Sequence, residues 1–438
     1  MTLPLDTIVA PATPLGRSAL AIVRIDGAAC FDILQRLTGG EVPPARHATL
    51  VRLLHPEPID ECIAVVYQSP HSFTGNDLVE LTLHGNPLLV ERVISACVSL
   101  GARMAEPGEF TERAVLNGKI DLVQAESVAD LINARTTLQA KLSLSNLEGV
   151  LSRKAAAIRA VLLDVISRLE AALDFSEEGY EFITTAETRS RLETALADTS
   201  VLADTYRRGH ATREGLSAVI LGRPNAGKST LLNRLVGSDR AIVTPIPGTT
   251  RDIVRETIEI GGLPVTLADT AGLRESADLV EGIGIERARE AARTADIVLY
   301  LVDATTGLAG EDRQELTVLE NVLLVYTKAD LAPTPADALS ISAVYDHGID
   351  KLLRRLDELV RERFAAPEGS LVNERQRLAV AECQAGLRAA LQSAEAGMDE
   401  QMIVVDLYRA ANALGVLTGA ITREDILTEI FGRFCIGK

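Results

Sequence analysis

The spacing of apolar residues changes along the chain. Up to Pro107, short apolar runs such as ALAIVRI, CIAVVYQ and LVELTLHG alternate with clusters of turn-forming residues, which predicts strands with one or two helices. Over residues 122–173 and again over residues 372–430, apolar residues recur at helical spacing. Proline is absent between Pro107 and Pro224 and again after Pro367. We therefore expect a long helical segment over residues 122–173 and helical structure over residues 372–430.

The region between the two helical stretches shows a third pattern. An apolar run at residues 216–221 leads into GRPNAGKST, and LLNRLV follows, which is typical of a strand, a glycine-rich turn and a helix. An amphipathic helix over residues 351–364 closes this region. The plainest arrangement joins the two helical stretches in one bundle. We therefore predict a multidomain chain with an α+β domain at residues 1–118, an all-α helical bundle at residues 119–210 and 367–438, and an inserted α/β P-loop domain at residues 211–366.

The stretch GRPNAGKST has the composition of a phosphate-binding P-loop. Gly222 and Gly227 allow the backbone to curl with its amides turned inward, and the following helix offers unpaired N–H groups at its start. Lys228 is expected to reach the terminal phosphates, and the Ser229 hydroxyl to bind Mg²⁺. A chance match to so short a motif is the alternative, and the motifs that follow it argue against chance.

Further motifs each follow an apolar run, in the order typical of a GTP-binding domain. DTAG at residues 269–272 comes after VTLA, so Asp269 is expected near the metal and the amide of Gly272 near the γ-phosphate. VLLVYTKAD ends in Asp330, whose carboxylate can accept two parallel hydrogen bonds from guanine that adenine does not offer. Ser342 and Ala343 are expected to close over the base. The predicted nucleotide is therefore GTP.

Composition narrows the functional classes. The formal net charge of -17 argues against broad electrostatic attachment to nucleic acid, and the aromatic content of 3% argues against a stacking platform for single strands. Any contact with RNA is therefore expected to be local or shared. The five cysteines are scattered without paired spacing, which indicates reduced thiols and no zinc site. The first residues lack a basic segment and a sustained apolar stretch, so we expect a cytoplasmic protein without a secretory or membrane signal.

The region after DTAG lacks the glutamine that many small GTPases use to orient the attacking water. Leu273 stands there instead, and leucine cannot make this contact. Asn225 in the P-loop can bind a monovalent cation beside the phosphates, with carbonyl oxygens added by Thr244 and Ile246. Both carbonyls precede prolines, so a proline-stiffened connector is the alternative reading of this loop. Thr250 is the expected second hydroxyl for Mg²⁺.

Several stretches together resemble one family. GRPNAGKST, PGTTRD, DTAGLRE with IGIER after it, and above all the terminal FCIGK are similar to the MnmE family of tRNA-modification GTPases, also called TrmE. PGEFTERA and LNGKIDLVQAESVADLI resemble the family outside the GTP-binding region. The resemblance extends along the whole chain. It implies an N-terminal domain that binds folate and forms a homodimer, a helical domain with an inserted GTP-binding domain, and K⁺-stimulated GTP hydrolysis.

The resemblance also implies partners and chemistry. The GTP-binding domains of a dimer would approach across K⁺, which takes the place of an arginine finger. A FAD-dependent partner resembling MnmG would complete a heterotetramer that acts on tRNA. The expected reaction adds a carboxymethylaminomethyl or aminomethyl group to C5 of the wobble uridine. The one-carbon unit would come from 5-formyl- or methylene-tetrahydrofolate, and the amine from glycine or ammonium.

Some individual roles rest on the resemblance alone. Glu281 corresponds to the family's catalytic glutamate, which aligns the attacking water through a bridging water, and a solvated loop acid is the alternative. Arg24, Glu80, Lys119 and Lys438 match the family's folate ligands, although by themselves they read as ordinary surface charges.

Two further residues keep two readings each. Cys435, close to the end of the chain, is either a thiolate nucleophile for the modification chemistry or a structural thiol. His84 stands near Glu80 and belongs either to the folate pocket or to the structure around it.

The motifs and the resemblance together give the full set of predicted GTP and metal ligands. Lys228 and Asn225 are also predicted to act in catalysis with Glu281, and Thr249 joins the predicted K⁺ ligands. The predicted nucleotide-binding residues are Asn225, Ala226, Gly227, Lys228, Ser229, Thr230, Thr244, Pro245, Ile246, Pro247, Gly248, Thr249, Thr250, Asp269, Thr270, Ala271, Gly272, Thr327, Lys328, Ala329, Asp330, Ser342 and Ala343.

The sequence departs from the family pattern at a few positions. Thr327 begins the guanine motif where asparagine is usual, so we expect the loss of an amide that braces the P-loop, and weaker nucleotide binding. Pro245 and Gly282 replace an aspartate and a basic residue, which affects the expected geometry of the switch loops.

Other functional classes remain open from sequence. A ribosome-assembly GTPase of the Era or EngA kind would need an RNA-binding domain of the KH type with a basic GXXG loop, and no such loop is evident near the termini. A folate-dependent one-carbon transferase regulated by GTP and acting alone would turn over folate without a flavoprotein.

Overall fold

The computed structural model describes residues 6–175, 182–237, 240–242, 255–269 and 290–421, together with residues 427, 430–432, 434 and 437. The chain forms two compact units. The first contains residues 1–129 and 411–438, and the second contains residues 130–410. Helices α4 (Leu122–Asn133) and α14 (Glu400–Thr418) each contribute residues to both units.

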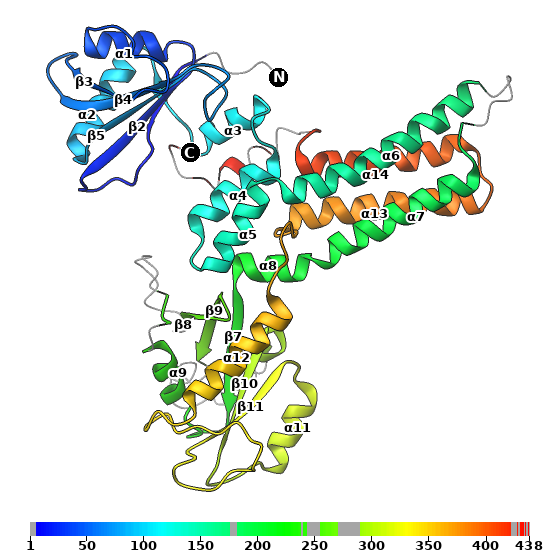
Figure 1. Ribbon diagram of the computed structural model, residues 1–438. Coiled ribbons are helices and arrows are strands. Elements are labelled where there is room, and N and C mark those ends of the chain that lie inside the picture. Colours follow the sequence, from blue (N-terminus) through cyan, green and yellow to red (C-terminus); the bar gives the residue numbers. More distant parts are fainter. Residues whose placement is uncertain are drawn as a thin grey trace, which may run out of the picture. The chain divides into compact units, whose positions relative to one another are not determined.

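The first unit is built on a six-stranded sheet with the order β3-β4-β5-β2-β1-β6 (Figure 1). All neighbouring strands are antiparallel except β1 and β6. Helices α1 (Cys30–Thr38) and α2 (Pro87–Ser99) share one core with the sheet, and α3 (Glu109–Leu116) joins a second core through Phe110. The strands are β1 (Ile8–Pro11), β2 (Leu20–Asp26), β3 (Thr49–Leu53), β4 (Asp60–Tyr67), β5 (Leu78–His84) and β6 (Arg103–Met104).

The alternating apolar runs of the sequence form the inner strands of this sheet. Residues 8 and 10 of β1 belong to one core and residue 9 to the other, because successive side chains of a strand point to opposite faces. The expected α+β character of the N-terminal region is therefore observed.

The C-terminal tail packs within the first unit. Leu427, Phe431 and Phe434 share a cluster with Leu122 and Ala125 of α4. The backbone of residue 431 lies so close to Gly108 that a Cβ added there would meet its carbonyl oxygen at 2.8 Å. A Cβ added at Gly437 would overlap the Pro11 carbonyl oxygen at the end of β1 even more severely. The end of the chain therefore reaches the strand beside β2.

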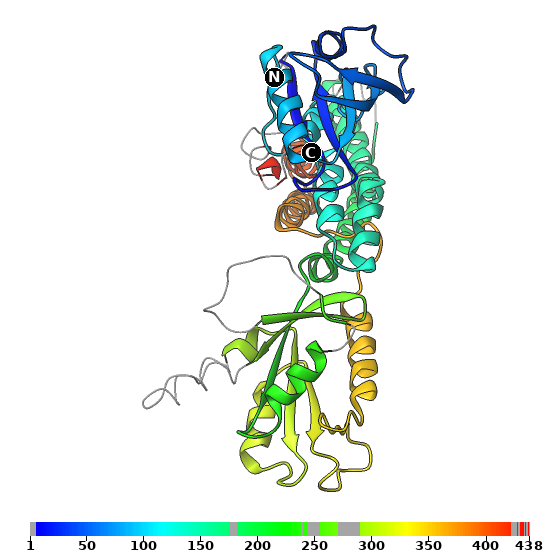
Figure 2. The same cartoon turned by 90° about the vertical axis from the view of Figure 1, so that its left-hand side faces the viewer.

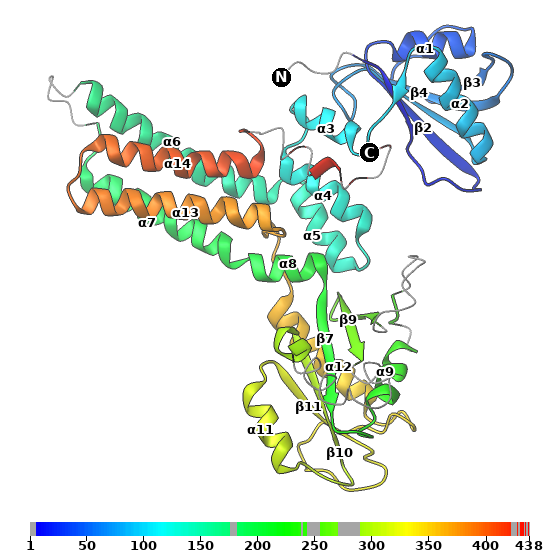
Figure 3. The same cartoon turned by 180° about the vertical axis from the view of Figure 1, so that it is seen from behind.

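The second unit contains a helical bundle and a second sheet. The bundle helices are α5 (Thr137–Leu147), α6 (Val150–Asp174), α7 (Thr185–Asp204), α8 (Tyr206–Glu214) and α13 (Glu374–Glu395). Helix α7 packs against both α6 and α13 (Figure 3), so residues from both proline-free stretches share one bundle.

The long helical segment predicted over residues 122–173 is instead broken twice. Helix α4 ends at Asn133. Thr136 then forms a capping box with Gln139, which starts the separate helix α5. Gly149, with φ of +80°, precedes α6. Glycine adopts this left-handed backbone conformation more readily than other residues. The conformation lies outside the right-handed helical range, so the helix does not continue through this position.

The sheet of the second unit has the order β11-β10-β7-β9-β8. All neighbours are parallel except β8 and β9. One face packs with α9 (Lys228–Val236) and α12 (Ile349–Phe364), and α12 runs along the sheet in Figure 2, where it is gold. Helix α11 (Gly310–Val318) adds Leu316 to the core of the other face. The strands are β7 (Leu216–Gly222), β8 (Arg255–Ile260), β9 (Leu263–Asp269), β10 (Ile297–Asp303) and β11 (Val322–Thr327).

Within the described part of the chain, none of the helices combines the length and the hydropathy that crossing a membrane requires.

Candidate functional site

The predicted GTP motifs meet at one edge of the second sheet. Strands β7, β9, β10 and β11 are parallel, so their carboxyl ends lie at the same edge. Gly222, Asp269, Asp303 and Thr327 end these strands, and Asp303 pairs directly with Thr327 in the register. In open α/β sheets, ligands bind beyond this edge. The fold therefore brings the P-loop and the guanine motif together, as the sequence predicts.

The P-loop backbone depends on its glycines. Gly222 has φ of +140°, and a Cβ added there would overlap the carbonyl oxygen of Leu301 in β10. Gly227 has φ of +89° directly before α9, and Asn225 has φ of +64°. Asparagine tolerates the left-handed region better than most residues. The loop therefore curls between β7 and α9 with the geometry expected of a phosphate cradle.

Lys228 places its charge inside this loop. Its ammonium donates to the carbonyl oxygens of Gly222 (2.9 Å) and Arg223 (2.8 Å), and the residue is only 9% exposed. Lys228 is also the first residue of α9, whose first-turn N–H groups have no partner within the helix. A cation and a helix N-terminus at the same point are features that attract phosphate groups.

Thr327 braces the P-loop through its hydroxyl. The side chain is buried, and Oγ1 donates to the Ala226 carbonyl oxygen at 2.8 Å. From the sequence, we expect threonine in place of asparagine to leave the P-loop without a brace. For the contact to Ala226 this expectation is wrong, because the threonine hydroxyl makes it. A hydroxyl has only one proton to donate, so threonine makes fewer simultaneous contacts than a carboxamide would.

We expect Thr327→Val to bind GDP about tenfold more weakly than the unchanged protein. Valine has the same shape but leaves the buried Ala226 carbonyl without a donor, which costs about 1–3 kcal/mol. Isothermal titration calorimetry measures the affinity. Thr317→Val on the exposed face of α11 is the matched control and should bind GDP normally. Equal affinities for the two variants would contradict the role of the brace.

Lys328 follows Thr327 and is held by Asp303, an acidic residue that the sequence motifs did not identify. Lys328 has φ of +54°, and its ammonium pairs with Asp303 Oδ2 at 2.7 Å. Burial acts to raise the pKa of Asp303, but hydrogen bonds from Lys328 and Thr305 outweigh it, so that pKa lies below its ordinary value. The signal for Asp303 in the sequence is its position at the end of the apolar run IVLYLV.

The remaining guanine-side residues lie on adjoining segments. Asp330 is exposed at the carboxyl end of β11, and the Ala329 amide donates to the Ile341 carbonyl oxygen at 3.1 Å. Ser342 is buried and exchanges two backbone hydrogen bonds with His347. Ala343 follows it. The fold therefore places Ser342 and Ala343 beside the segment that carries Asp330, and their closure over the base stays a prediction.

A second network ties the P-loop to α11. The Arg223 Nε donates to Asp312 Oδ1 at 3.0 Å, and the hydroxyl of the buried Tyr300 donates to the same oxygen at 2.9 Å. The other Asp312 oxygen accepts from the Ala309 amide at 2.8 Å, at the start of α11. No motif signals this network, because the partner of Arg223 lies far along the chain.

Several predicted GTP and metal ligands lie outside the described residues. These are Thr244, Pro245, Ile246, Pro247, Gly248, Thr249, Thr250, Thr270, Ala271, Gly272 and Glu281. The backbone of Asp269 is described and its side chain is not. Ser229 and Thr230 are exposed in the first turn of α9, next to Lys228.

The predicted folate residues gather around one loop of the first unit. Arg24 and Glu80 are paired in the register of β2 and β5, and Arg24 Nε donates to Glu80 Oε1 at 2.7 Å. The Arg24 guanidinium also lies over the ring of Phe73 at 5.9 Å. The Lys119 ammonium donates to the Pro70 carbonyl oxygen at 2.9 Å. Arg24 and Lys119 therefore contact the same loop, residues 68–77.

The C-terminal tail approaches the same place. Gly437 lies against Pro11, and β1 pairs with β2 so that its Ala10 is opposite Arg24. Lys438 and Cys435 lie outside the described residues. The neighbour of Lys438 is therefore close to the strand that carries Arg24.

Sequence reasoning missed Tyr67 and Phe73 in this cluster. The Tyr67 hydroxyl donates to Glu80 Oε2 at 3.3 Å, and Phe73 is 40% exposed. Partly exposed aromatic rings beside paired charges suit a flat, polar ligand. His84 instead pairs with Asp60 at 2.7 Å, which favours the structural reading of this histidine.

The described cysteines behave as structural thiols. Cys30, Cys62, Cys97 and Cys383 are free and buried. Burial raises the pKa of Cys62, Cys97 and Cys383 to about 12 each, and that of Cys30 also lies above its ordinary value. They are therefore protonated at neutral pH and are poor nucleophiles.

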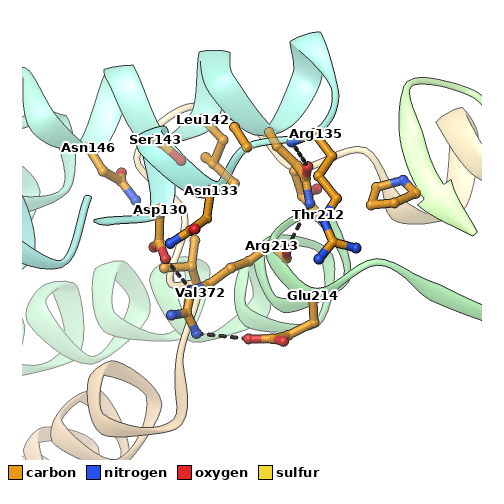
Figure 4. Close-up of a pocket in the computed structure, with 13 residues that line it drawn as sticks. Asp130, Asn133, Arg135, Leu142, Ser143, Asn146, Thr212, Arg213, Glu214 and Val372 are labelled. Atoms are coloured by element: carbon orange, nitrogen blue, oxygen red, sulfur yellow. Dashed lines mark hydrogen bonds and ion pairs between the residues drawn. The ribbon is translucent and has the colours of Figure 1, made fainter. Parts of the chain in front are cut away.

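A cavity of about 240 Å³ lies where the helices of the second unit meet the start of β7 (Figure 4). Arg213 Nε donates to Asp130 Oδ1 at 2.7 Å, and Gln139 Nε2 donates to the Arg213 carbonyl oxygen at 2.8 Å. Helix α8 ends at Glu214, directly before β7. Helices α4 and α5 are therefore hydrogen-bonded to the segment that leads into the P-loop strand.

Comparisons with known proteins agree along the whole chain. Residues 7–119 match the family described as GTP-binding protein TrmE N-terminus, and residues 122–435 match the MnmE helical domain. The tRNA modification GTPase MnmE of Koribacter versatilis is 42% identical over 450 residues, covering 99% of each chain. The protein of the same name from Thermotoga maritima is 41% identical over 458 residues, covering 99% of this chain and 100% of that one.

One solved structure that is similar to this chain matches a part of it. The G domain of the Thermotoga maritima FeoB iron transporter is 23% identical and covers 33% of this chain and 97% of that chain, with a TM-score of 0.25. This likeness supports no statement about function. The P-loop and the guanine motif lie at one sheet edge, as a GTPase requires. The full-length relatives at about 40% identity and the two family matches show that the chain belongs to the MnmE (TrmE) family of tRNA modification GTPases.

Proposed function

We propose that this chain binds and hydrolyses GTP in the service of tRNA modification. The observation that carries the proposal is the P-loop of the second unit, where Lys228 lies inside the loop and Thr327 of the guanine motif braces it. The family membership supports the link to tRNA. The carboxylate of Asp330 can accept two hydrogen bonds that guanine offers and adenine does not, so GTP is the proposed substrate.

We also propose the predicted domain organisation. An N-terminal folate-binding and dimerisation domain would comprise residues 1–118, a helical domain residues 119–210 and 367–438, and the inserted G domain residues 211–366. The contact between α7 and α13 supports one bundle formed on both sides of the G domain. The homodimer is proposed from the family resemblance.

Potassium and magnesium are the proposed metal ions. Ser229 and Thr250 would hold Mg²⁺, and Asn225, Thr244, Ile246 and Thr249 would hold K⁺. The left-handed backbone of Asn225 turns this residue at the tip of the P-loop, where its amide oxygen is a suitable ligand for a monovalent cation. When bound, K⁺ supplies positive charge that offsets the charge of the transition state.

Glu281 is the proposed catalytic residue that aligns the attacking water, because Leu273 cannot. A Glu281→Ala variant that folds, binds GTP and retains normal turnover would rule out this role.

We expect GTP hydrolysis to be several-fold faster in KCl than in NaCl at equal ionic strength. The physical reason is that Na⁺ is smaller than K⁺, so ligands spaced for K⁺ would coordinate it less well and the transition-state charge would be less well offset. Phosphate release at saturating GTP measures the effect. Choline chloride at the same ionic strength controls for salt effects on folding. Equal rates in all three salts would contradict the K⁺ site.

Reduced folate is the proposed one-carbon donor. Arg24, Glu80, Lys119 and Lys438 would hold 5-formyl- or methylene-tetrahydrofolate, because arginine and lysine suit its carboxylates and the glutamate can accept from the pterin. The loop 68–77 contacts both Arg24 and Lys119, which supports a shared site. Fluorescence titration with 5-formyltetrahydrofolate tests it: Arg24→Ala should weaken binding, and unchanged affinity would contradict the assignment.

The modification itself is proposed to need a partner. A FAD-dependent protein resembling MnmG would form a heterotetramer with the homodimer, and the product would be a carboxymethylaminomethyl or aminomethyl group at C5 of the wobble uridine. The net charge of -17 supports a partner that carries much of the tRNA contact. Reconstitution with and without the flavoprotein tests this step, because product formed without it would favour a transferase that acts alone.

A further inference from the structure

A groove runs along the outer edge of the second sheet, away from the P-loop strand. Strand β11 is the last in the sheet order, and it lies near α12 in Figure 3. The groove has a volume of about 840 Å³. Leu323, Leu324 and Leu339 line it with apolar groups, and Lys351, Arg354 and Arg355 of α12 line it with positive charge.

The edge of β11 has backbone groups without hydrogen-bond partners in the described part of the chain. Tyr326 donates to the Leu339 carbonyl oxygen and accepts from the Ile341 amide, both at 2.8 Å, on the side away from β10. Alternate residues of a strand direct their backbone groups to the same side, so Val322 and Leu324 face outward as Tyr326 does. Over residues 290–421, no backbone hydrogen bond fills this side of Val322 or Leu324. The short segment at residues 339–341 therefore leaves most of the edge open.

Among the residues that the structure describes, the positive charges at the groove are only partly paired. Arg355 pairs with Glu358 at 3.3 Å, and Asp337 also lines the groove. Lys351 and Arg354 are exposed and form no ion pair with any residue that the structure describes. In a chain with a net charge of -17, two such cations beside an open strand edge favour an acidic partner.

We propose that this groove binds an extended acidic peptide segment of a partner protein. The segment would add a strand beside Val322 and Leu324, in line with residues 339–341, and place its carboxylates near Lys351 and Arg354. This mode of binding draws affinity from backbone hydrogen bonds and specificity from alternate side chains. An apolar floor and an open strand edge suit a peptide backbone better than a nucleic acid, which binds through phosphates and stacked bases.

The first test uses a fluorescein-labelled peptide of alternating valine and glutamate with the full-length protein. Fluorescence anisotropy at low salt should show binding, and Arg354→Glu should weaken it about tenfold, because an attraction becomes a repulsion. Arg361→Glu is the matched control, since it makes the same charge change at an exposed position of α12 outside the groove. Equal effects of the two variants would overturn the proposal.

The second test separates strand addition from charge attraction alone. Two peptides of the same charge carry N-methyl groups on opposite edges, so that only one of them keeps the N–H groups of its binding edge. The peptide with N-methyl groups on its binding edge should bind at least about fivefold more weakly than the other peptide, because the hydrogen bonds that it loses at the strand edge are not replaced. Hydrogen exchange of the Val322 and Leu324 amides should also slow when the unmethylated peptide binds. Equal binding of the two peptides, unchanged exchange at these amides, or Arg354-dependent binding of polyuridylate instead of the peptide would each refute the inference.

Discussion

Lys228→Ala is expected to lower kcat/KM for GTP hydrolysis by about 10³-fold, because charge that offsets the transition state is lost from the centre of the site. The ammonium lies within the P-loop, held by the carbonyl oxygens of Gly222 and Arg223. A bound nucleotide would offer it phosphate oxygens in place of these carbonyls. The brace at Thr327 bonds to Ala226 rather than to this ammonium, and circular dichroism checks that the variant is folded.

Steady-state phosphate release measures the effect of this substitution. Lys141→Ala on the exposed face of α5 removes the same charge far along the chain from the P-loop and should leave turnover unchanged. A folded Lys228→Ala protein with the turnover of this control would show that hydrolysis does not use the P-loop as described.

Gly222→Ala is expected to destabilise the second sheet by about 3 kcal/mol. A left-handed backbone costs a side chain about 1–3 kcal/mol, and the new Cβ would also overlap the Leu301 carbonyl oxygen in the neighbouring strand. Relief of this overlap requires β7 and β10 to separate. Nucleotide affinity should fall together with stability, because the P-loop begins at this residue.

Native-state hydrogen exchange of the amides in β7 and β10 measures this loss without a global unfolding model. Gly307→Ala is the matched control, since Gly307 also has a positive φ of +67° but no atom within 4 Å of an added Cβ. The control isolates the backbone cost, which is about 1 kcal/mol. Equal protection in the two variants would contradict the close approach of β7 to β10.

Much of the fold and part of the site are predictable from the sequence, because they rest on local patterns. The run at residues 216–221, the glycines of the P-loop and the KAD of the guanine motif each carry their own signal of period or turn chemistry. Parallel strands then bring their carboxyl ends together, so the order of motifs is enough to predict that the P-loop and Thr327 lie at the same edge.

Contacts between distant residues could not be predicted in this way. The Thr327 hydroxyl replaces an expected amide in bracing Ala226, and only the position of the two backbones shows that a shorter side chain reaches. The bond from Arg223 to Asp312 depends on how α11 returns to the sheet. The breaks at Thr136 and Gly149 had local signals, a capping box and a glycine, but the continuous apolar period masked them.

The same limit applies to the residues that are proposed to bind folate. Arg24 and Glu80 are far apart in the chain, and their pairing follows from the register of β2 and β5 rather than from any motif. The approach of Gly437 to Pro11 depends on the path of the whole tail. These contacts are products of tertiary packing, which a pattern along the chain does not encode.

Nucleoside analysis of tRNA is the most direct test of the central claim that this chain uses GTP hydrolysis to support tRNA modification. Cells that lack the chain should lose the modified wobble uridine, the unchanged gene should restore it, and Lys228→Ala should not, although it is expressed to the same level. A wobble uridine that is fully modified in cells without the chain, or restored equally by Lys228→Ala, would contradict the account.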